Sequence, residues 1–127
     1  MSFLPVSLYL QDRPCLVVGG GAVAARKVRQ LRKAGGAVRV VAPELVPELS
    51  GLLAAGELRW TQGNFSPELL DNCVLAIAAT DDRAVNARVS ELAQQRGIPV
   101  NVVDDPALCS FIMPSVVDRN PVTIAIS

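Results

Sequence analysis

The stretch CLVVGGGAVA, residues 15–24, decides the fold of this 127-residue chain. Its first four residues form a continuous apolar run, which is typical of a central strand buried on both faces of a sheet. Three glycines then permit a tight turn, and residues 22–34 have the apolar spacing of a helix that ends at Gly35. A buried strand, a glycine turn and a helix in this order predict the start of a βαβ unit.

Strands and helices alternate along the rest of the chain. The pattern predicts, in order, a strand at 38–41, a helix at 46–55, a strand at 58–61, a strand at 73–79, a helix between Asp82 and Gly97 and a strand at 99–103. Residues 6–10 are predicted as one more strand, and 111–117 with 122–126 as a terminal hairpin around a turn at 118–121. The expected fold class is α/β, a Rossmann-type doubly wound, mostly parallel sheet with a C-terminal β-hairpin. We expect residues 1–110 to form the Rossmann domain and residues 111–127 the hairpin.

Composition excludes several classes of function. Lys plus Arg and Asp plus Glu number 12 each, so no global field recruits nucleic acid or an anionic membrane. No apolar run is long enough for a membrane helix, and the N-terminus lacks a signal-peptide pattern. The three widely spaced cysteines fit neither a zinc site nor a disulfide framework, which indicates a cytoplasmic protein. The chain has no histidine, so any general base must be another residue type.

The glycine turn fits the dinucleotide-binding pattern G-x-G-x-x-G/A in the required context. Gly19 permits the turn, Gly21 lets the backbone approach a pyrophosphate, and Ala24 lets the helix pack close to the strand. The N-terminus of the helix supplies N–H groups and partial positive charge. A glycine turn without a ligand is the alternative. Glu44, which follows Pro43 after the second strand, is the candidate for the ribose hydroxyls, and because no arginine stands there NAD is favoured over NADP.

Two other segments reach the carboxyl edge of the predicted sheet, where open α/β sheets bind ligands. Asp104, just past the fifth predicted strand, is the candidate for a carboxylate that faces the reacting part of a ligand; the alternative is a turn aspartate before a proline. Asp81 and Asp82 are interpreted as helix caps rather than catalysts. Five basic residues make the first helix a solvated surface or an aid to binding a polyanion: Arg26, Lys27, Arg29, Arg32 and Lys33.

Several stretches together match one family. They are Leu4-Pro5-Val6, residues 15–27, Ala79-Thr80-Asp81-Asp82 with Val85-Asn86, Asn101-Val102-Val103-Asp104, and residues 110–115 followed by Asp118-Arg119. From about Leu4 to the final residue, the chain resembles the N-terminal domain of sirohaem synthase, the precorrin-2 dehydrogenase/sirohydrochlorin ferrochelatase module. The glycine motif is generic, whereas the combination of 101–104 and 110–115 is specific to this family.

The resemblance implies NAD-dependent oxidation of precorrin-2 to sirohydrochlorin, followed in many members by insertion of ferrous iron to give sirohaem. It implies that Asp104 serves both steps and holds the metal transiently. The implied NAD contacts map onto the glycine turn and the tips of two strands: Gly19, Gly21, Ala22, Val23, Pro43 and Glu44, with Thr80 and Asp81 beside the cofactor. A carboxylate can accept the protons in both steps, so the lack of histidine is no objection.

Family members continue past the hairpin into a dimerisation region, whereas this chain stops at Ser127. It therefore resembles either an excised NAD-binding domain or an unusually short member, and we expect a homodimer in the full-length protein, with the hairpin as the start of the dimerisation region. A non-catalytic NAD-sensing regulatory domain is the runner-up. It would share the glycine turn but would have no reason to carry both 101–104 and 110–115. A dehydrogenase without chelatase activity remains a third interpretation.

Overall fold

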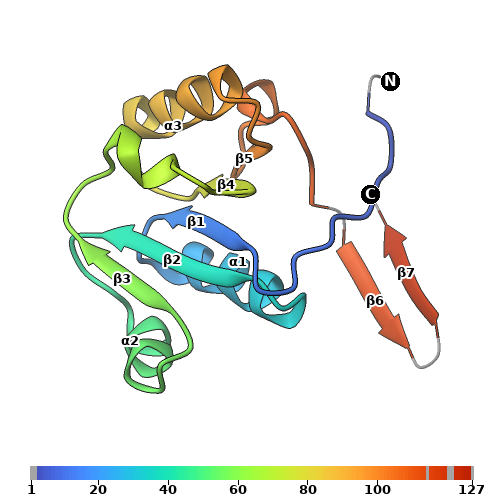
Figure 1. Cartoon of the computed structure of the whole chain (residues 1–127), viewed down its shortest axis with the longest axis horizontal. Coiled ribbons are helices and arrows are strands. Elements are labelled where there is room, and N and C mark those ends of the chain that lie inside the picture. The colour runs from blue at the N-terminus through green and yellow to red at the C-terminus, as the bar shows by residue number, and fades with distance from the viewer. Residues whose placement is uncertain (1–2, 114, 120–121, 127) are drawn as a thin grey trace.

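Five parallel strands form the central sheet of the computed structural model, which describes residues 3–113, 115–119 and 122–126 (Figure 1). Across the sheet the strands lie in the order β3 (Arg59–Gln62), β2 (Ala37–Ala42), β1 (Pro14–Val18), β4 (Leu75–Ala78) and β5 (Val100–Val102). A separate antiparallel pair is formed by β6 (Ser115–Arg119) and β7 (Val122–Ile126). The predicted doubly wound fold is confirmed.

The strand order places a topological switch point between β1 and β4. From β1 the chain moves outward through β2 to β3, then crosses back to β4 and continues in the opposite direction to β5. The loops that follow β1 and β4 therefore diverge to opposite faces of the sheet. Open α/β sheets bind their ligands at this point, outside the carboxyl ends of the strands.

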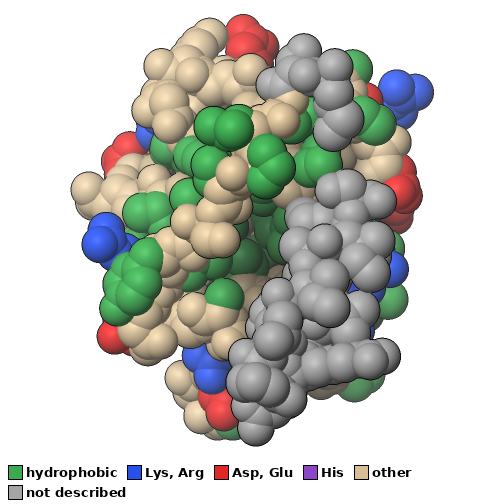
Figure 2. Space-filling view, turned by 90° about the vertical axis from the view of Figure 1, so that its right-hand side faces the viewer, with side chains coloured by type: hydrophobic (Ala, Val, Ile, Leu, Met, Phe, Trp, Pro, Cys, Tyr) green, Lys and Arg blue, Asp and Glu red, His purple; other side chains and the backbone are tan. Residues whose placement is uncertain are grey.

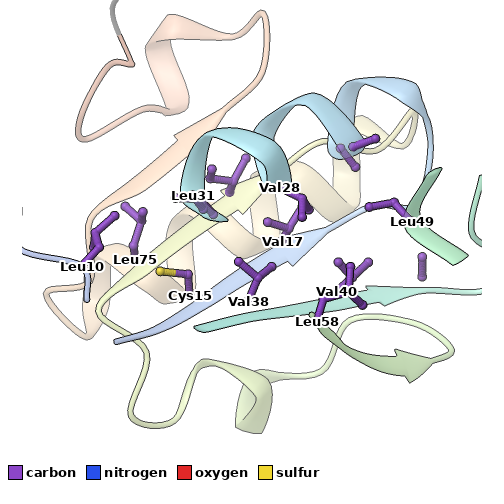
Figure 3. Packing of buried hydrophobic residues seen from close by; sticks show 14 residues of the cluster. Leu10, Cys15, Val17, Val28, Leu31, Val38, Val40, Leu49, Leu58 and Leu75 are labelled. Carbon is purple, nitrogen blue, oxygen red and sulfur yellow. The ribbon is translucent and has the colours of Figure 1, made fainter. Parts of the chain in front are cut away.

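Helices cover both faces of the sheet. α1 (Ala22–Lys33) and α2 (Pro47–Ala54) pack on one face, while α3 (Arg83–Gln95) and the short 3₁₀ helix η1 (Pro67–Leu70) pack on the other. Successive residues of β1 point to alternate faces, so Val17 joins the cluster under α1 and Leu16 the cluster under α3. Figure 3 shows Val28 and Leu31 of α1 near Val17. The continuous apolar run in β1 is thus explained by burial on both faces.

The ends of the helices differ in a way that matters for function. Asp82 caps α3, because its Oδ1 accepts the N–H groups of Ala84 at 2.9 Å and Val85 at 3.2 Å. This confirms the cap interpretation for Asp82 but not for Asp81, which precedes the N-cap position. Gly21 stands at the N-cap of α1, and no side chain among the described residues caps the N–H groups there. The first turn of α1 therefore keeps donors for a ligand.

Two basic residues of α1 form ion pairs with the chain around α2. Arg29 Nη1 lies 2.6 Å from Glu48 Oε1, and Arg32 Nη2 lies 3.5 Å from Glu57 Oε2. All four side chains are partly exposed, so these pairs contribute little to the free energy of unfolding. The exposure of these arginines agrees with the interpretation of this helix face as a solvated surface, with two of its charges paired.

Two predicted strands are wrong in whole or in part. Residues 6–10 form no strand; the segment is extended and exposed, and only Leu10 is buried. Its apolar alternation is that of a strand, but neither edge of the sheet pairs with it. Residues 111–113 are also not a strand, and β6 begins at Ser115. Of the predicted turn at 118–121, the first two residues belong to β6 and the last two lie outside the described residues.

The cysteines agree with the prediction of unpaired residues. Cys15 is buried, Cys73 and Cys109 are half-buried, and all three are free thiols. In the part of the chain that the structure describes, no helix combines the length and apolar character needed to span a bilayer.

Candidate functional site

A cleft of about 790 Å³ opens at the carboxyl edge of the sheet, over the switch point between β1 and β4. Its volume falls in the range usual for ligand and cofactor sites. The structure brings every site residue predicted from the sequence to the lining of this one cleft: Gly19, Gly21, Ala22, Val23, Pro43, Glu44, Thr80, Asp81 and Asp104. These residues come from four separate loops, so the cleft exists only in the folded chain.

The three glycines of the turn have different structural roles. Gly19 has a φ of +132°, and a Cβ there would overlap the carbonyl oxygen of Ala79 in the loop after β4. A Cβ on Gly20 would overlap the carbonyl oxygen of Glu44 in the loop after β2. A Cβ on Gly21 would meet nothing within 4 Å. Gly19 and Gly20 are therefore required for packing, whereas Gly21 leaves open space in the cleft.

The first turn of α1 faces that open space and suits an anionic group. Gly21, Ala22 and Val23 line the cleft, and the first backbone bond of the helix runs from the N–H of Ala25 to the oxygen of Gly21 at 3.0 Å. The preceding N–H groups carry the partial positive charge of the helix end. Gly21 carries no side chain, and the N–H groups beside it have no partner inside the helix. A pyrophosphate therefore fits this part of the cleft, as the binding of a dinucleotide requires.

Hydrogen bonds hold the loops on either side of the glycine turn. The N–H of Val46 donates to the oxygen of Gly20 at 2.9 Å, which ties the loop after β2 to the turn. In the loop after β4, Thr80 Oγ1 donates to Asn86 Oδ1 at 2.7 Å, and Asn86 Nδ2 donates back to the oxygen of Thr80 at 3.0 Å. Asn86 is buried, so this pair anchors one wall of the cleft to α3.

Asp104 stands on an unusual backbone conformation. The N–H of Asp105 donates to the oxygen of Val102 at 3.2 Å, so Asp104 is the third residue of a tight turn, and its φ is +62°. Aspartate, like glycine and asparagine, tolerates this left-handed region, and Asp12 and Asn72 adopt it elsewhere in the chain. The turn of the alternative interpretation is thus present. Asp104 is exposed and lines the cleft, so its carboxylate is accessible to a ligand bound there.

The segment after that turn folds back along β5. Cys109 Sγ accepts the N–H of Val102 at 3.2 Å. The N–H of Ser110 donates to the oxygen of Val100 at 2.8 Å, and Asn101 Nδ2 donates to the oxygen of Phe111 at 3.2 Å. Residues 101–104 and 110–111 are thus physically joined, which explains why both stretches occur together. Phe111 packs against the core under α1 and is not among the residues that line the cleft.

The charges on the cleft lining are one-sided. Four carboxylates line it, those of Glu44, Asp81, Asp82 and Asp104, and none of the described lining residues is Lys or Arg. The N-terminus of α1 is therefore the source of positive potential in the lining itself.

Sequence reasoning missed several lining residues. No role was predicted for Gly20, yet a side chain there would overlap the backbone of Glu44, which explains why this position of the turn is also a glycine. Asn64 and Phe65, in the loop after β3, also line the cleft, and no motif marks them. Val85 and Val103 complete its apolar surface. Their roles depend on how the loops meet, which local patterns do not encode.

Known proteins resemble this chain over its whole length. It is 58% identical to "Siroheme synthase" of Methylobacillus flagellatus and 55% identical to that of Photorhabdus laumondii subsp. laumondii, in each case across 100% of this chain and 27% of the relative. The chain thus spans about a quarter of the curated relatives' length. The resemblance to sirohaem synthase stated from the sequence is confirmed.

Solved structures agree. "SirC, precorrin-2 dehydrogenase" superposes with a TM-score of 0.84 and 31% identity, covering 98% of this chain and 61% of that one. D-lactate dehydrogenase from Escherichia coli, with a TM-score of 0.60 and 14% identity over 81% of this chain and 32% of that one, shares the fold alone. The profile of a family described as "Putative NAD(P)-binding" matches residues 6–115. With a glycine turn and cleft that fit the predicted nicotinamide dinucleotide, the chain belongs to this NAD(P)-binding family.

Proposed function

We propose that this chain binds NAD and forms the dehydrogenase site that oxidises precorrin-2 to sirohydrochlorin. The observation that carries the proposal is the placement of Asp104, an exposed carboxylate, in the same cleft as the glycine turn. The likeness to proteins named siroheme synthase and precorrin-2 dehydrogenase supports this substrate.

In this proposal, the N–H groups at the start of α1 hold the pyrophosphate, and Gly21 leaves room for it. The Glu44 carboxylate, two residues past the end of β2, accepts hydrogen bonds from the ribose hydroxyls. The same carboxylate would repel the 2′-phosphate of NADP, and no basic side chain among the described lining residues offsets it. NAD is therefore the expected cofactor.

Oxidation of precorrin-2 removes a hydride and a proton from the macrocycle. When bound, NAD supplies the hydride acceptor. The Asp104 carboxylate accepts the proton; it is a base that requires no histidine, and its exposure lets it reach a substrate at the mouth of the cleft. Val85 and Val103 line the cleft and reduce access of water to the reacting carbon.

The test is an anaerobic assay of the full-length protein with precorrin-2 and NAD, in which sirohydrochlorin formation is followed by absorbance. Asp104→Asn is the matched variant, because asparagine tolerates a positive φ and lacks only the charge. We expect it to lower kcat at least about a hundredfold while NAD affinity is retained. If the wild-type protein binds NAD but oxidises no precorrin-2, the NAD-sensing interpretation replaces this one. If Asp104→Asn retains its activity, the assigned base is wrong.

Insertion of ferrous iron into sirohydrochlorin is part of the proposal, with iron as a substrate. Asp104 would hold the ion briefly while the pyrrole nitrogens lose their protons. The described residues include no group of three or more Cys, Asp or Glu side chains that could hold a metal ion. Addition of Fe²⁺ or Co²⁺ to preformed sirohydrochlorin tests this: a metal-dependent change in absorbance that the wild-type protein catalyses and Asp104→Asn does not supports it. Normal oxidation without insertion leaves a dehydrogenase alone.

We further propose that the full-length protein is a homodimer. In this proposal residues 1–110 are the Rossmann domain, and the dimerisation region starts with the hairpin of residues 111–127. The N-terminal segment supports this, because Leu4, Val6 and Tyr9 are 81%, 71% and 74% exposed. Figure 2 looks onto the side of the molecule where this segment runs and shows hydrophobic side chains gathered at the surface. Light scattering should give a dimer that Leu4→Asp with Val6→Asp disrupts; a monomeric wild-type protein would contradict the proposal.

A further inference from the structure

Lys27 differs from the other basic residues of α1. Arg26 and Arg29 are exposed, and Arg29 and Arg32 pair with carboxylates near α2. Lys27 is half-buried beside the core positions Ala24, Val28 and Leu31. Its side chain thus belongs to a different side of the helix from the ion pairs.

That side of the helix adjoins the cleft. Lys27 follows Val23 by four residues, which is one helical turn, and Val23 lines the cleft together with Asp104. The pKa of Lys27 is lowered, first by loss of solvation and then by the charge of Arg26, while the Asp104 carboxylate and Cys109 act in the opposite direction. Lys27 thus stands one helical turn behind the lining residue Val23, on the side of α1 away from the ion pairs with α2.

The Lys27 ammonium and the Asp104 carboxylate form no ion pair in the described structure. Arg29, Arg32, Arg83 and Arg96 have carboxylates within 4.0 Å, but no such contact joins Lys27 to Asp104. An ammonium that has lost solvation without gaining a close carboxylate gains free energy from an incoming one.

The proposed substrate supplies that group, and the cleft creates the need for it. Tetrapyrroles of this class carry many carboxylates, whereas the cleft lining itself carries four and no Lys or Arg among its described residues. A polyanion that approaches Asp104 would be repelled unless a cation stood close to it.

We infer that Lys27 is a substrate-binding residue, whose ammonium takes a carboxylate of the tetrapyrrole and places the macrocycle against Asp104. This inference rests on the proposed function, and it names the group that makes the acidic cleft selective for a polycarboxylate. It assigns Lys27 to the tetrapyrrole rather than to NAD, whose pyrophosphate faces the first turn of the helix.

The experiment compares Lys27→Met, Lys27→Arg and Arg59→Met in the full-length protein. Methionine retains the apolar stem and removes the charge, and arginine retains the charge. Arg59 is exposed at the start of β3, on the opposite edge of the sheet, and controls for a change in net charge. Sirohydrochlorin is titrated by its absorbance at several salt concentrations, which needs no turnover. NAD affinity, KM and kcat for precorrin-2 and Tm are measured beside it.

We expect Lys27→Met to weaken sirohydrochlorin binding and raise KM about tenfold, with kcat changed less than about threefold. Sirohydrochlorin binding by Lys27→Met should depend less on salt, and Lys27→Arg should restore most of the affinity. The NAD affinity and the Tm of Lys27→Met should stay near the wild-type values. Arg59→Met should bind sirohydrochlorin as the wild-type protein does.

Unchanged sirohydrochlorin affinity in Lys27→Met would overturn the inference and leave the proposed function intact. The same holds for a loss confined to Tm, since that result would assign Lys27 a structural role. If the wild-type protein binds sirohydrochlorin through Lys27 but oxidises no precorrin-2, the proposed function fails and the inference stands. If the wild-type protein binds no sirohydrochlorin, the inference fails, while the proposed function is decided by the oxidation of precorrin-2.

Discussion

Substitution of neighbouring glycines should separate cofactor binding from folding. Gly21 has φ −92° and ψ −168°, an extended conformation open to any residue, and a Cβ there would meet nothing within 4 Å. Gly21→Ala removes conformational freedom from the unfolded chain, which raises the free energy of unfolding by about 0.4–1 kcal/mol. Alanine is a poorer N-cap than glycine by a similar amount. The two terms oppose each other, so the free energy of unfolding should change by less than about 1 kcal/mol.

The same methyl group should weaken NAD binding strongly. It would occupy the space that the proposal gives to the pyrophosphate, beside the N–H groups of Ala22 and Val23. Loss of one hydrogen bond to a charged group costs about 1.5–3 kcal/mol, which corresponds to roughly a 10- to 150-fold increase in Kd.

Gly20→Ala is the matched control with the opposite signature. Its Cβ would overlap the backbone oxygen of Glu44 and lie 2.8 Å from the Cβ of Ala42. Relief of this overlap requires the loops after β1 and β2 to separate, and overpacking of this kind costs about 1–3 kcal/mol. We expect its Tm to fall by about 4–10 °C, whereas that of Gly21→Ala should stay within about 4 °C of wild type.

Two measurements decide the comparison. Thermal unfolding is followed by circular dichroism, and the Kd for NAD is measured by calorimetry at a temperature where all three proteins are folded. The reasoning is refuted if Gly21→Ala binds NAD as tightly as wild type, because the pyrophosphate would then lie elsewhere. It is also refuted if the two variants lose the same stability.

Three further predictions concern the framework of the cleft. Asp82→Ala should lower the free energy of unfolding in urea by about 1 kcal/mol through loss of the cap of α3, and Asp82→Asn should retain most of it; equal losses would contradict capping. Asn86→Ala should lower the free energy of unfolding by about 1–3 kcal/mol and weaken NAD binding, since Thr80 loses its buried partner. An unchanged NAD affinity would show that this loop does not contact the cofactor. Burial raises the pKa of Cys15 from 9.0 to about 11, so the stability that depends on its neutral thiol is present below pH 9 and falls between pH 9 and 11. Urea unfolding of Cys15→Ala should lack that part of the decline, and identical slopes would contradict it.

The sequence determined the features that depend on neighbours along the chain. The apolar run of β1 requires burial on both faces, and alternation with helices then leads to a parallel sheet with its ligand site at the carboxyl edge. The glycine turn and the cap at Asp82 are local motifs and were correctly placed. The nine predicted site residues all reach one cleft, because each follows a strand whose end the topology places at that edge.

Tertiary structure decided what depends on partners distant in sequence. Residues 6–10 alternate between apolar and polar side chains as a strand does. A strand also needs a neighbouring strand to pair with, and neither edge strand of the sheet pairs with this segment. Gly20 and Gly21 are indistinguishable in the sequence and both line the cleft, and only the loop that carries Glu44 excludes a side chain at the first while the second has open space beside it. Lys27 and Arg29 are likewise two equivalent basic residues in the sequence, and only folding half-buries the first and pairs the second with Glu48. Periodicity records which residues become buried, whereas the identity of the groups that meet across loops is set by the packing of the whole chain.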